Sequence, residues 1–298
     1  MIQKPRAKGF TIGKFIGRGS FGDVWIAIHN KSGNRFACKR IMKSTLQKNK
    51  RFDMINQEIQ TMISLNHQNI IKFHSFQENE IEFLLFLDLC DTDLDNYVMA
   101  HGRIPEIVAL DILKQILISL AKIHENGICH RDLKPSNVLI KDFPFIVLSD
   151  FGFSIMMDQH NLVNETCGTL SYIAPEVFSG KYDGCAADIW SAGLVFYFMV
   201  KGKVPWDSIS LATLENQKID FCEKLARSDS KIDRFLSRLM CNDYSKRYSA
   251  IRALDDPIFH GPAIHINSIL RSDSASQPVF SSFQMKKNRK YRISFENE

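Results

Sequence analysis

One short polar run carries the groups that could do chemistry. Residues 130–137 read His-Arg-Asp-Leu-Lys-Pro-Ser-Asn, so a carboxylate, an ammonium group and a side-chain amide fall within eight residues. A segment with helical apolar periodicity ends before the run at Gly127, and an apolar strand, residues 138–140, follows it. A polar loop between packed elements is the usual place for catalytic groups. A solvated turn is the alternative, but Asp150, at the start of an Asp-Phe-Gly run, also directly follows an apolar strand, residues 145–148.

Three glycines lie between two segments of strand-like alternation near the N-terminus. Residues 17–24, Gly-Arg-Gly-Ser-Phe-Gly-Asp-Val, separate the alternating residues 10–16 from residues 24–28, which predicts a hairpin. Glycine lets a backbone approach phosphate oxygens closely and direct N–H groups at them. A dinucleotide-binding loop would need a following helix, and a Walker loop would need Gly-Lys-Ser/Thr; the sequence has neither. A hairpin turn without a ligand is the alternative.

A lysine within an apolar strand indicates an ion pair. Residues 36–41 alternate as a strand that carries Lys39 on an apolar face, and an ammonium group there needs a partner. A helix is predicted over residues 52–65, and Glu58 lies beside its apolar face, where it could pair with Lys39. That predicted face comprises Ile55, Ile59, Met62 and Ile63. A solvated Glu58 is the alternative.

The remaining elements must position these groups. Two further strands are predicted at residues 70–76 and 82–89, and an amphipathic helix over residues 107–125 leads into the polar run. Residues 189–200 are apolar nearly all round, which predicts a helix in the centre of a lobe. Asp188 would open this helix, and its carboxylate can accept backbone N–H bonds and steady the polar run.

In this order and at these positions, the runs resemble the glycine-rich loop, catalytic loop and magnesium loop of eukaryotic serine/threonine protein kinases. The resemblance covers about residues 10–259. It implies an α+β, bilobal protein kinase fold, with the kinase domain at residues 10–260. A small, mostly antiparallel β N-lobe with one helix would span residues 10–87, a hinge residues 88–93, and a larger, mainly helical C-lobe residues 94–260. Residues 261–298 would form a flexible, serine-rich and basic tail.

The resemblance also implies a role for each candidate residue. Asp132 would accept or orient the proton of the substrate hydroxyl, and Lys134 would steady the transferring phosphoryl charge. The implied catalytic residues are Asp132, Lys134, Lys39, Glu58 and Thr169. The implied ATP-binding residues are Ile16, Gly17, Gly19, Gly22, Val24, Ala37, Lys39, Asp88, Cys90 and Leu139. The implied magnesium ligands are Asn137 and Asp150, whose oxygens suit a hard cation.

Two charge pairs in the C-lobe are implied as well. Glu165 falls where many kinases carry an activating phosphothreonine, so its fixed charge would face Arg131 in place of the phosphate. Phosphorylation of Thr166, the next residue, is the competing possibility. Arg247 is implied to pair with Glu176 of the Ala-Pro-Glu motif, as a device that fixes register rather than a source of stability.

Specificity is implied by a few positions. A lysine at position 134 marks serine/threonine kinases. Asp93 matches an acidic position that binds the ribose or a basic substrate side chain, which implies protein substrates with a basic residue upstream of the phosphoacceptor. Ser136 replaces an acidic residue that many kinases of basic substrates carry, which puts a requirement for a second arginine in doubt. Residues 167–172 look most like the calcium/calmodulin-regulated and checkpoint kinases.

Composition sets outer limits on the function. The chain has a formal net charge of +5 and seven cysteines, with no Cys-x-x-Cys pair, which favours free thiols in a reducing compartment. Residues 1–8 are basic but lack an apolar core, so we expect no secretory signal. The apolar residues 189–200 fall short of the ~20 that span a bilayer. The sequence shows no basic face with interleaved aromatics of the kind that indicates nucleic-acid binding. We expect a monomeric catalytic domain in the cytoplasm and/or the nucleus, without membrane or nucleic-acid partners; basic residues 286–292 are either a nuclear signal or a solvated charge run.

These expectations converge on one function. We expect a serine/threonine protein kinase that transfers the γ-phosphate of Mg-ATP to protein hydroxyls, in checkpoint-kinase-like signalling. A pseudokinase scaffold, which binds partners without catalysis, usually lacks one of Lys39, Asp132 and Asp150, and all three are present. A small-molecule phosphotransferase would lack the run at residues 168–176 that docks a peptide.

Overall fold

The computed structural model describes residues 4–19, 22–48, 52–157, 162–206 and 211–260, apart from the side chains of residues 47, 48, 52–54, 211 and 212. The described residues of Met1–Phe259 form one compact unit, and the fold is described for that unit. The predicted tail, residues 261–298, lies outside the described residues.

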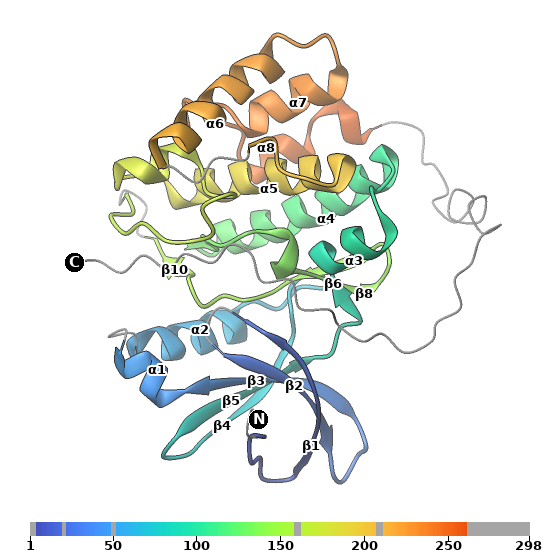
Figure 1. Ribbon diagram of the computed structural model, residues 1–298, viewed down its shortest axis with the longest axis vertical. Helices are drawn as coiled ribbons and strands as arrows, with labels where there is room; N and C mark the ends of the chain where they lie inside the picture. The colour runs from blue at the N-terminus through green and yellow to red at the C-terminus, as the bar shows by residue number, and fades with distance from the viewer. Residues whose placement is uncertain (1–3, 20–21, 49–51, 158–161, 207–210, 261–298) are drawn as a thin grey trace, which may run out of the picture. The chain divides into compact units, whose positions relative to one another are not determined.

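An antiparallel sheet of five strands makes up the N-lobe, in the order β1-β2-β3-β5-β4 (Figure 1). The strands are β1 Phe10–Arg18, β2 Asp23–His29, β3 Arg35–Met42, β4 Phe73–Glu78 and β5 Glu82–Asp88. Alternate apolar side chains on neighbouring strands meet in one buried cluster, which comprises Trp25, Ala27, Cys38, Leu84 and Phe86. Phe10 stacks on Phe86 with ring centroids 4.0 Å apart. The predicted antiparallel N-lobe is confirmed.

Two helices, rather than the one expected, belong to the N-lobe. Helix α1 spans Lys43–Lys48 and lies against β3 and α2, which spans Phe52–Ser64 (Figure 1). The predicted apolar face of α2 is wrong at Ile63, which is 56% exposed. With about 3.6 residues per turn, Ile63 points about 80° away from Ile55, whereas Met62 points within about 20° of it. Only Met62 therefore continues the buried stripe.

Helices dominate the C-lobe, as predicted. They are α3 Leu94–His101, α4 Glu106–Glu125, α5 Gly184–Lys201, α6 Leu211–Ala226, α7 Lys231–Leu239 and α8 Ala250–Leu254. Helix α5 is buried nearly all round and packs against α4 and α7. The predicted start of this helix at Asp188 is wrong. The helix begins at Gly184, because the Asp183 carboxylate accepts the Ala186 N–H and caps it.

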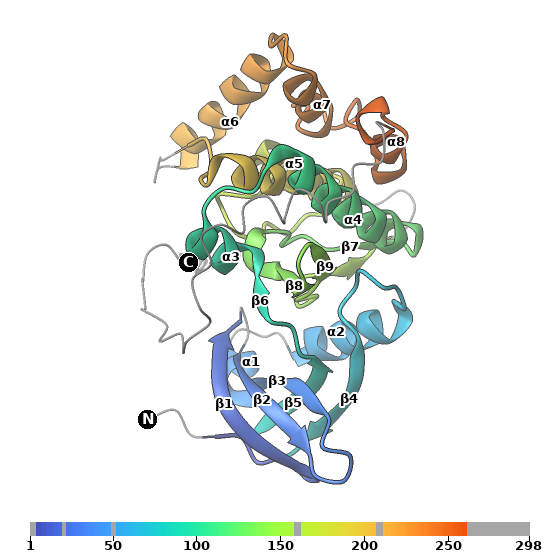
Figure 2. The ribbon, with the colours of Figure 1, turned by 90° about the vertical axis from the view of Figure 1, so that its right-hand side faces the viewer.

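Short elements between the helices carry the loops of interest. Strands β6 Thr92–Asp93, β8 Val138–Asp142 and β9 Phe145–Leu148 form one sheet, while β7 Ile128–Cys129 pairs with β10 Ile155–Met156. Three 3-10 turns are η1 Pro135–Asn137, η2 Pro175–Ser179 and η3 Pro257–Phe259. Figure 2 shows the chain passing through β6 from the N-lobe sheet to the helical C-lobe. Among the described residues, no helix has the length and apolar character needed to cross a membrane.

Candidate active site

The polar run of residues 130–137 is a loop attached to the central helix α5 by its backbone. The N–H groups of His130 and Arg131 donate to Oδ2 and Oδ1 of Asp188, both at 2.8 Å. Asp188 is buried within α5, and His124 of α4 also contacts its Oδ2, at 2.9 Å. The predicted contact between Asp188 and this loop is confirmed, so the centre of the lobe fixes the start of the loop.

Two residues of the site have a left-handed backbone. Arg131 and Asp150 both adopt a φ of 65°, a conformation that costs an ordinary residue about 1 kcal/mol. Gly168, with a φ of 99°, packs beside Arg131 so closely that an added Cβ would stand 2.6 Å from the Arg131 carbonyl oxygen. Unfavourable backbone conformations persist where neighbours hold them, which is common at functional sites.

Asp132 is the centre of a cluster of polar side chains. Lys134 Nζ donates to Asp132 Oδ2 at 2.6 Å and to Thr169 Oγ1 at 2.8 Å, and the Thr169 hydroxyl donates to Asp132 Oδ1 at 2.9 Å. The Asn137 amide donates to the Asp132 carbonyl at 2.8 Å and to Oδ2 at 3.2 Å. The Asp132 side chain is only 1% exposed, so these bonds set its orientation. The structure thus brings four of the predicted site residues together.

Lys39 binds two carboxylates, Glu58 in the N-lobe and Asp150 in the C-lobe. Its Nζ, on β3, donates to Glu58 Oε1 of α2 at 2.5 Å and to Asp150 Oδ1 at 2.7 Å. Burial opposes ionisation of Asp150, but the Lys39 ammonium holds the pKa of that carboxyl at about 2, below its usual 3.8. Burial likewise opposes the charge on Lys39, and its two carboxylates nevertheless raise its pKa. Glu58 is buried and paired, so the solvated alternative is wrong.

The two clusters meet where Asn137 contacts Ser149. The Ser149 N–H and hydroxyl both donate to the Asn137 carbonyl, at 2.9 and 3.0 Å, which brings the following residue, Asp150, close to Asn137. The side-chain oxygens of Asn137 and Asp150 are hard ligands of the kind that magnesium binds, together with waters and phosphate oxygens. Among the described residues, no group of three or more His, Cys, Asp or Glu side chains could form a closed metal cage. The amide oxygen of Asn137 and the carboxylate of Asp150 are a donor set that fits magnesium bound together with a phosphate.

The glycine-rich run joins β1 to β2, as predicted, although residues 20 and 21 lie outside the described residues. Among the described residues, an added Cβ at Gly17 would meet nothing within 4 Å, and one at Gly19 would approach the Gly22 carbonyl alone, at 3.6 Å. A Cβ on Gly22 would stand 1.8 Å from the Arg40 carbonyl oxygen. Packing against β3 thus explains the third glycine, whereas Gly17 and Gly19 have open space beside them, where a phosphate could approach.

The predicted walls of an adenine site lie on neighbouring strands. Val24 is the register partner of both Gly17 and Lys39, and Ala37 is the register partner of Leu87. Leu139, on β8, stands opposite Asp93 of β6. Ile16, on β1, is half-buried. These positions lie in the N-lobe sheet and in the β6–β8 pair, and their contact with ATP stays a prediction.

The hinge candidates differ in what their side chains do. The Asp88 carboxylate binds His74 at 2.6 Å and Lys141 at 2.9 Å; burial raises its pKa, but these partners lower it overall. The Asp88 carboxylate is thus taken up by two side-chain partners, and contact of Asp88 with ATP stays a prediction. Cys90 is half-buried between β5 and β6. Burial of its thiol raises its pKa to about 11, so it is protonated at neutral pH.

Asp93 caps a helix, a role that the sequence reasoning did not assign. Its Oδ1 accepts the Asn96 N–H at 2.9 Å, and its Oδ2 accepts the Asn96 side-chain amide at 2.6 Å. Asp93 is thus the N-cap of α3. Burial raises its pKa, against the effect of these two bonds. Any role of Asp93 in binding a basic side chain is additional to this cap.

Arg131 reaches the segment that leads to Thr169. Its Nη2 lies 3.1 Å from Glu165 Oε2, and its Nε donates to the Phe153 carbonyl at 2.8 Å. The predicted contact between Arg131 and Glu165 is confirmed. Glu165 is 59% exposed, so solvent screens the pair. The Thr166 hydroxyl donates to the Val177 carbonyl at 3.3 Å, and neither residue's role in activation is tested by these contacts.

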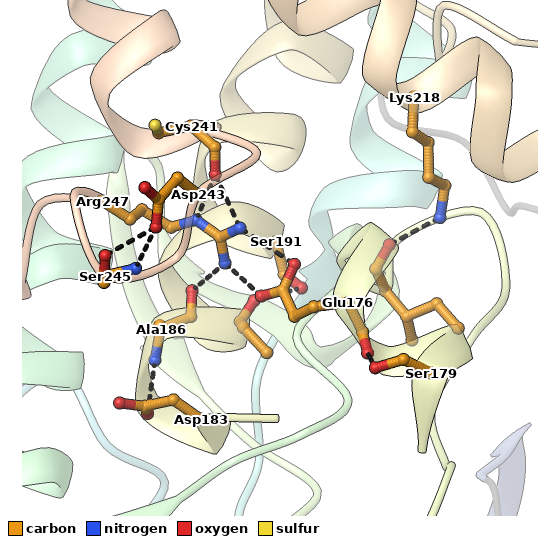
Figure 3. Close-up of polar contacts among 12 residues, drawn as sticks. Glu176, Ser179, Asp183, Ala186, Ser191, Lys218, Cys241, Asp243, Ser245 and Arg247 are labelled. Atoms are coloured by element: carbon orange, nitrogen blue, oxygen red, sulfur yellow. Dashed lines mark hydrogen bonds and ion pairs between the residues drawn. The ribbon is translucent and has the colours of Figure 1, made fainter. Parts of the chain in front are cut away.

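The predicted pair of Arg247 with Glu176 is confirmed, and a neighbouring lysine was missed. Arg247 binds both carboxylate oxygens of Glu176, at 2.5 and 3.0 Å (Figure 3). Lys218, on α6, reaches the same region with a fully buried side chain. The available signal was a lysine on the apolar stripe of α6, four residues after Leu214 and four before Cys222, which are both buried.

Comparison with known proteins agrees with this geometry. The family described as "Protein kinase domain" matches residues 10–259. The carbon catabolite-derepressing protein kinase of Candida tropicalis is 36% identical over 199 residues, which cover 66% of this chain and 32% of that protein. CBL-interacting protein kinase 8 of Oryza sativa subsp. japonica is 35% identical over 212 residues, or 70% and 48% of the two chains. Serine/threonine-protein kinase ATG1a of Arabidopsis thaliana is 36% identical over 202 residues, or 66% and 32%. The chain spans about a third to a half of the length of these relatives.

Proposed function

The chain belongs to the protein kinase family, and on that basis we propose that it transfers the γ-phosphoryl group of Mg-ATP to serine and threonine hydroxyls of proteins. The observation that carries this proposal is the cluster of Asp132, Lys134 and Thr169, linked through Asn137 to the pair of Lys39 and Asp150. Phosphoryl transfer requires positioned reactants and charge neutralisation more than covalent chemistry. Buried, mutually bonded side chains of opposite charge can supply both the positioning and the neutralisation.

Each side chain then has a task in the reaction. Asp132 accepts the proton of the substrate hydroxyl as the hydroxyl oxygen attacks the γ-phosphorus, the bond from that phosphorus to the β–γ bridging oxygen breaks, and ADP leaves. Lys134 offsets the charge that develops on the transferring phosphoryl group. Lys39, held by Glu58, binds phosphate oxygens of ATP. Asn137 and Asp150 would hold magnesium, which neutralises phosphate charge when bound. The Asp132 carboxylate needs its bonds to Thr169 and Asn137 to keep it aimed at the hydroxyl.

The test is phosphate transfer from labelled ATP. The purified chain is incubated with Mg-ATP and, in parallel, an arginine-containing serine peptide, its tyrosine counterpart, and a sugar or amine. We expect label on the serine peptide, and at least about a hundredfold less of it in Asp132→Asn, the scale of losing one transition-state contact. Label only on the small molecules would overturn the proposal, as would ATP binding without any transfer, the behaviour of a pseudokinase.

The finer assignments rest on single features. We infer substrates with a basic residue upstream of the phosphoacceptor from the half-buried Asp93 carboxylate, and a peptide array with arginine at each position tests this. Residues 167–172 favour the calcium/calmodulin-regulated or checkpoint group, and one relative is named as a CBL-interacting kinase. Binding of calcium-loaded calmodulin to the full chain tests the first of these. We propose a cytoplasmic and/or nuclear location, which imaging of the tagged full chain checks.

A further inference from the structure

Lys218 is a buried ammonium group held by the main chain of another segment. The residue lies on α6 and is 0% exposed. Its Nζ donates to the carbonyl oxygens of Leu170 and Ile173, at 2.7 and 2.5 Å. The rings of Phe178 and Trp206 lie beneath it, with centroids 5.1 and 5.2 Å away, a distance that suits cation–π attraction. Within the described part of the chain, its hydrogen-bond partners are carbonyls and not a carboxylate. The ammonium group therefore holds the backbone of the segment that carries these carbonyls.

We call that segment, residues 169–173, the docking segment. Lys218 binds two of its carbonyls, at its second and last positions. The other carbonyls are bound as well. Trp206 Nε1 donates to Ser171, Ser191 Oγ donates to Tyr172, and the N–H groups of Tyr172 and Ile173 donate to Thr169. The Thr169 carbonyl is thus bound within the segment, and the four carbonyls that follow it are bound by C-lobe side chains. The path of this backbone is fixed by its C-lobe partners, of which Lys218 alone serves two positions.

The docking segment begins at the residue that touches Asp132. The Thr169 hydroxyl bonds Asp132 and Lys134, and Leu170, the next residue, gives its carbonyl to Lys218. A displacement of the Leu170 carbonyl therefore moves the backbone that carries the Thr169 hydroxyl. Lys39, on the phosphate side of the site, is held by Glu58 and Asp150, and neither carboxylate belongs to the docking segment.

We propose that Lys218 is a positioning residue for the protein substrate. It holds the docking segment in the conformation that receives the peptide and keeps Thr169 on Asp132, and it leaves ATP binding unaffected. The expected effect on the Michaelis constants rests on the proposed kinase function, whereas the anchoring of the segment does not. Removing the side chain leaves the half-buried Leu170 carbonyl and the buried Ile173 carbonyl without their donor, and we expect the segment to shift so that water reaches them.

The bonds do not require a positive charge. Burial lowers the pKa of Lys218 to about 7, although Glu176 of η2 and Cys222 of α6 act in the opposite direction. A neutral amine still has two N–H groups, one for each carbonyl. An uncharged side chain with two donors should therefore keep part of the function, whereas an apolar side chain of similar length should not.

The experiment compares three variants of the full chain. Lys218→Met removes both donors, Lys218→Gln keeps two N–H groups without the charge, and Lys224→Met is the matched control at an exposed lysine of the same helix. We expect Lys218→Met to raise KM for a serine peptide about tenfold or more, the scale of one lost bond to a charged donor. KM for ATP should stay within about threefold, Lys218→Gln should lie between Met and wild type, and Lys224→Met should match wild type.

Hydrogen exchange tests the anchoring without any turnover. The amides of Tyr172 and Ile173 should exchange faster in Lys218→Met than in Lys224→Met, while those of α5 exchange equally. Unchanged peptide KM and unchanged exchange would overturn the inference, as would equal rises in both Michaelis constants. If Lys218→Met does not fold, the same comparison with Lys218→Gln decides. If the wild type phosphorylates no peptide, the proposed function fails by itself, and hydrogen exchange still judges the role of Lys218.

Discussion

Removing the Glu176 carboxylate should strongly destabilise the C-lobe. Arg247 is fully buried and Glu176 nearly so, and two parallel bonds join them. The guanidinium group also donates to the carbonyls of Cys241 and Ala186, which hold it in place (Figure 3). In Glu176→Ala the guanidinium cannot leave, and its charge stays buried without a counter-ion. Breaking a buried pair in this way costs about 3–5 kcal/mol.

The size of the effect can be set against an exposed pair in the same lobe. Arg227 Nη2 lies 3.0 Å from Glu223 Oε2, but the side chains of Arg227 and Glu223 are 80% and 55% exposed. Such an i,i+4 pair contributes about 0.3–0.5 kcal/mol, so Glu223→Ala serves as the control. For a domain of this size, about 1 kcal/mol corresponds to roughly 2–4 °C in Tm. We therefore expect Glu176→Ala to lower Tm by roughly 6–20 °C, and the control by less than about 2 °C.

The assay is thermal unfolding followed by circular dichroism, at one protein concentration and without nucleotide. Urea unfolding of the same variants gives the free energy independently. If Glu176→Ala and Glu223→Ala unfold at the same temperature, burial does not set the strength of these pairs, and the reasoning is refuted.

Four other outcomes follow from the site. Asp150→Asn, which tolerates the left-handed backbone, should lower kcat at least about a hundredfold at saturating Mg-ATP, and peptide phosphorylation near the wild-type rate would disprove the metal assignment. Burial opposes ionisation of Asp150, but Lys39 lowers the pKa of its carboxyl from the usual 3.8 to about 2. The carboxylate therefore stabilises the fold above pH 3.8 and loses this effect as the pH falls towards 2. The difference in free energy of unfolding between wild type and Asp150→Asn, measured in urea, should shrink over that pH window, and a constant difference would contradict the pairing. Glu165→Gln should reduce activity while changing the free energy of unfolding by less than about 1 kcal/mol, because Glu165 is exposed; if Thr166→Ala abolishes activity and Glu165→Gln does not, the fixed-charge idea is wrong. Asp93→Asn keeps a good helix cap and should raise KM for an arginine peptide but not for its alanine counterpart, and equal values for both variants of the peptide would remove Asp93 from substrate binding.

The residues with local signals were predicted well. The runs at 130–137 and at Asp150 follow helices or strands that apolar periods reveal, and bonds from Ser149 to Asn137 bring the two runs together. The pairing of Lys39 with Glu58 was predicted because a lysine on an apolar strand needs a counter-charge. These inferences required only a period, a breaker or an unmatched charge in the sequence.

The misses have physical causes that one sequence does not display. Helix α1 contains one buried apolar residue, Leu46, so it has no stripe to detect, and its contacts with β3 and α2 hold it instead. The start of α5 was misplaced because the apolar run begins at Ile189, while the cap is Asp183. The contacts of Lys218 join it to carbonyls 48 and 45 residues away in the chain. A carbonyl is present at every position, so no residue type marks such a partner.

The left-handed backbone at Asp150 has a consequence for engineering this domain. Glycine accepts a φ of 65° without steric cost, so backbone preference alone favours Asp150→Gly, whereas the salt link to Lys39 and the proposed reaction favour aspartate. A directed-evolution screen that rewards only heat resistance would set the backbone gain of glycine against the loss of the salt link to Lys39, with no selection for the reaction itself. A screen that also scores turnover would hold the aspartate in place against its own conformational preference.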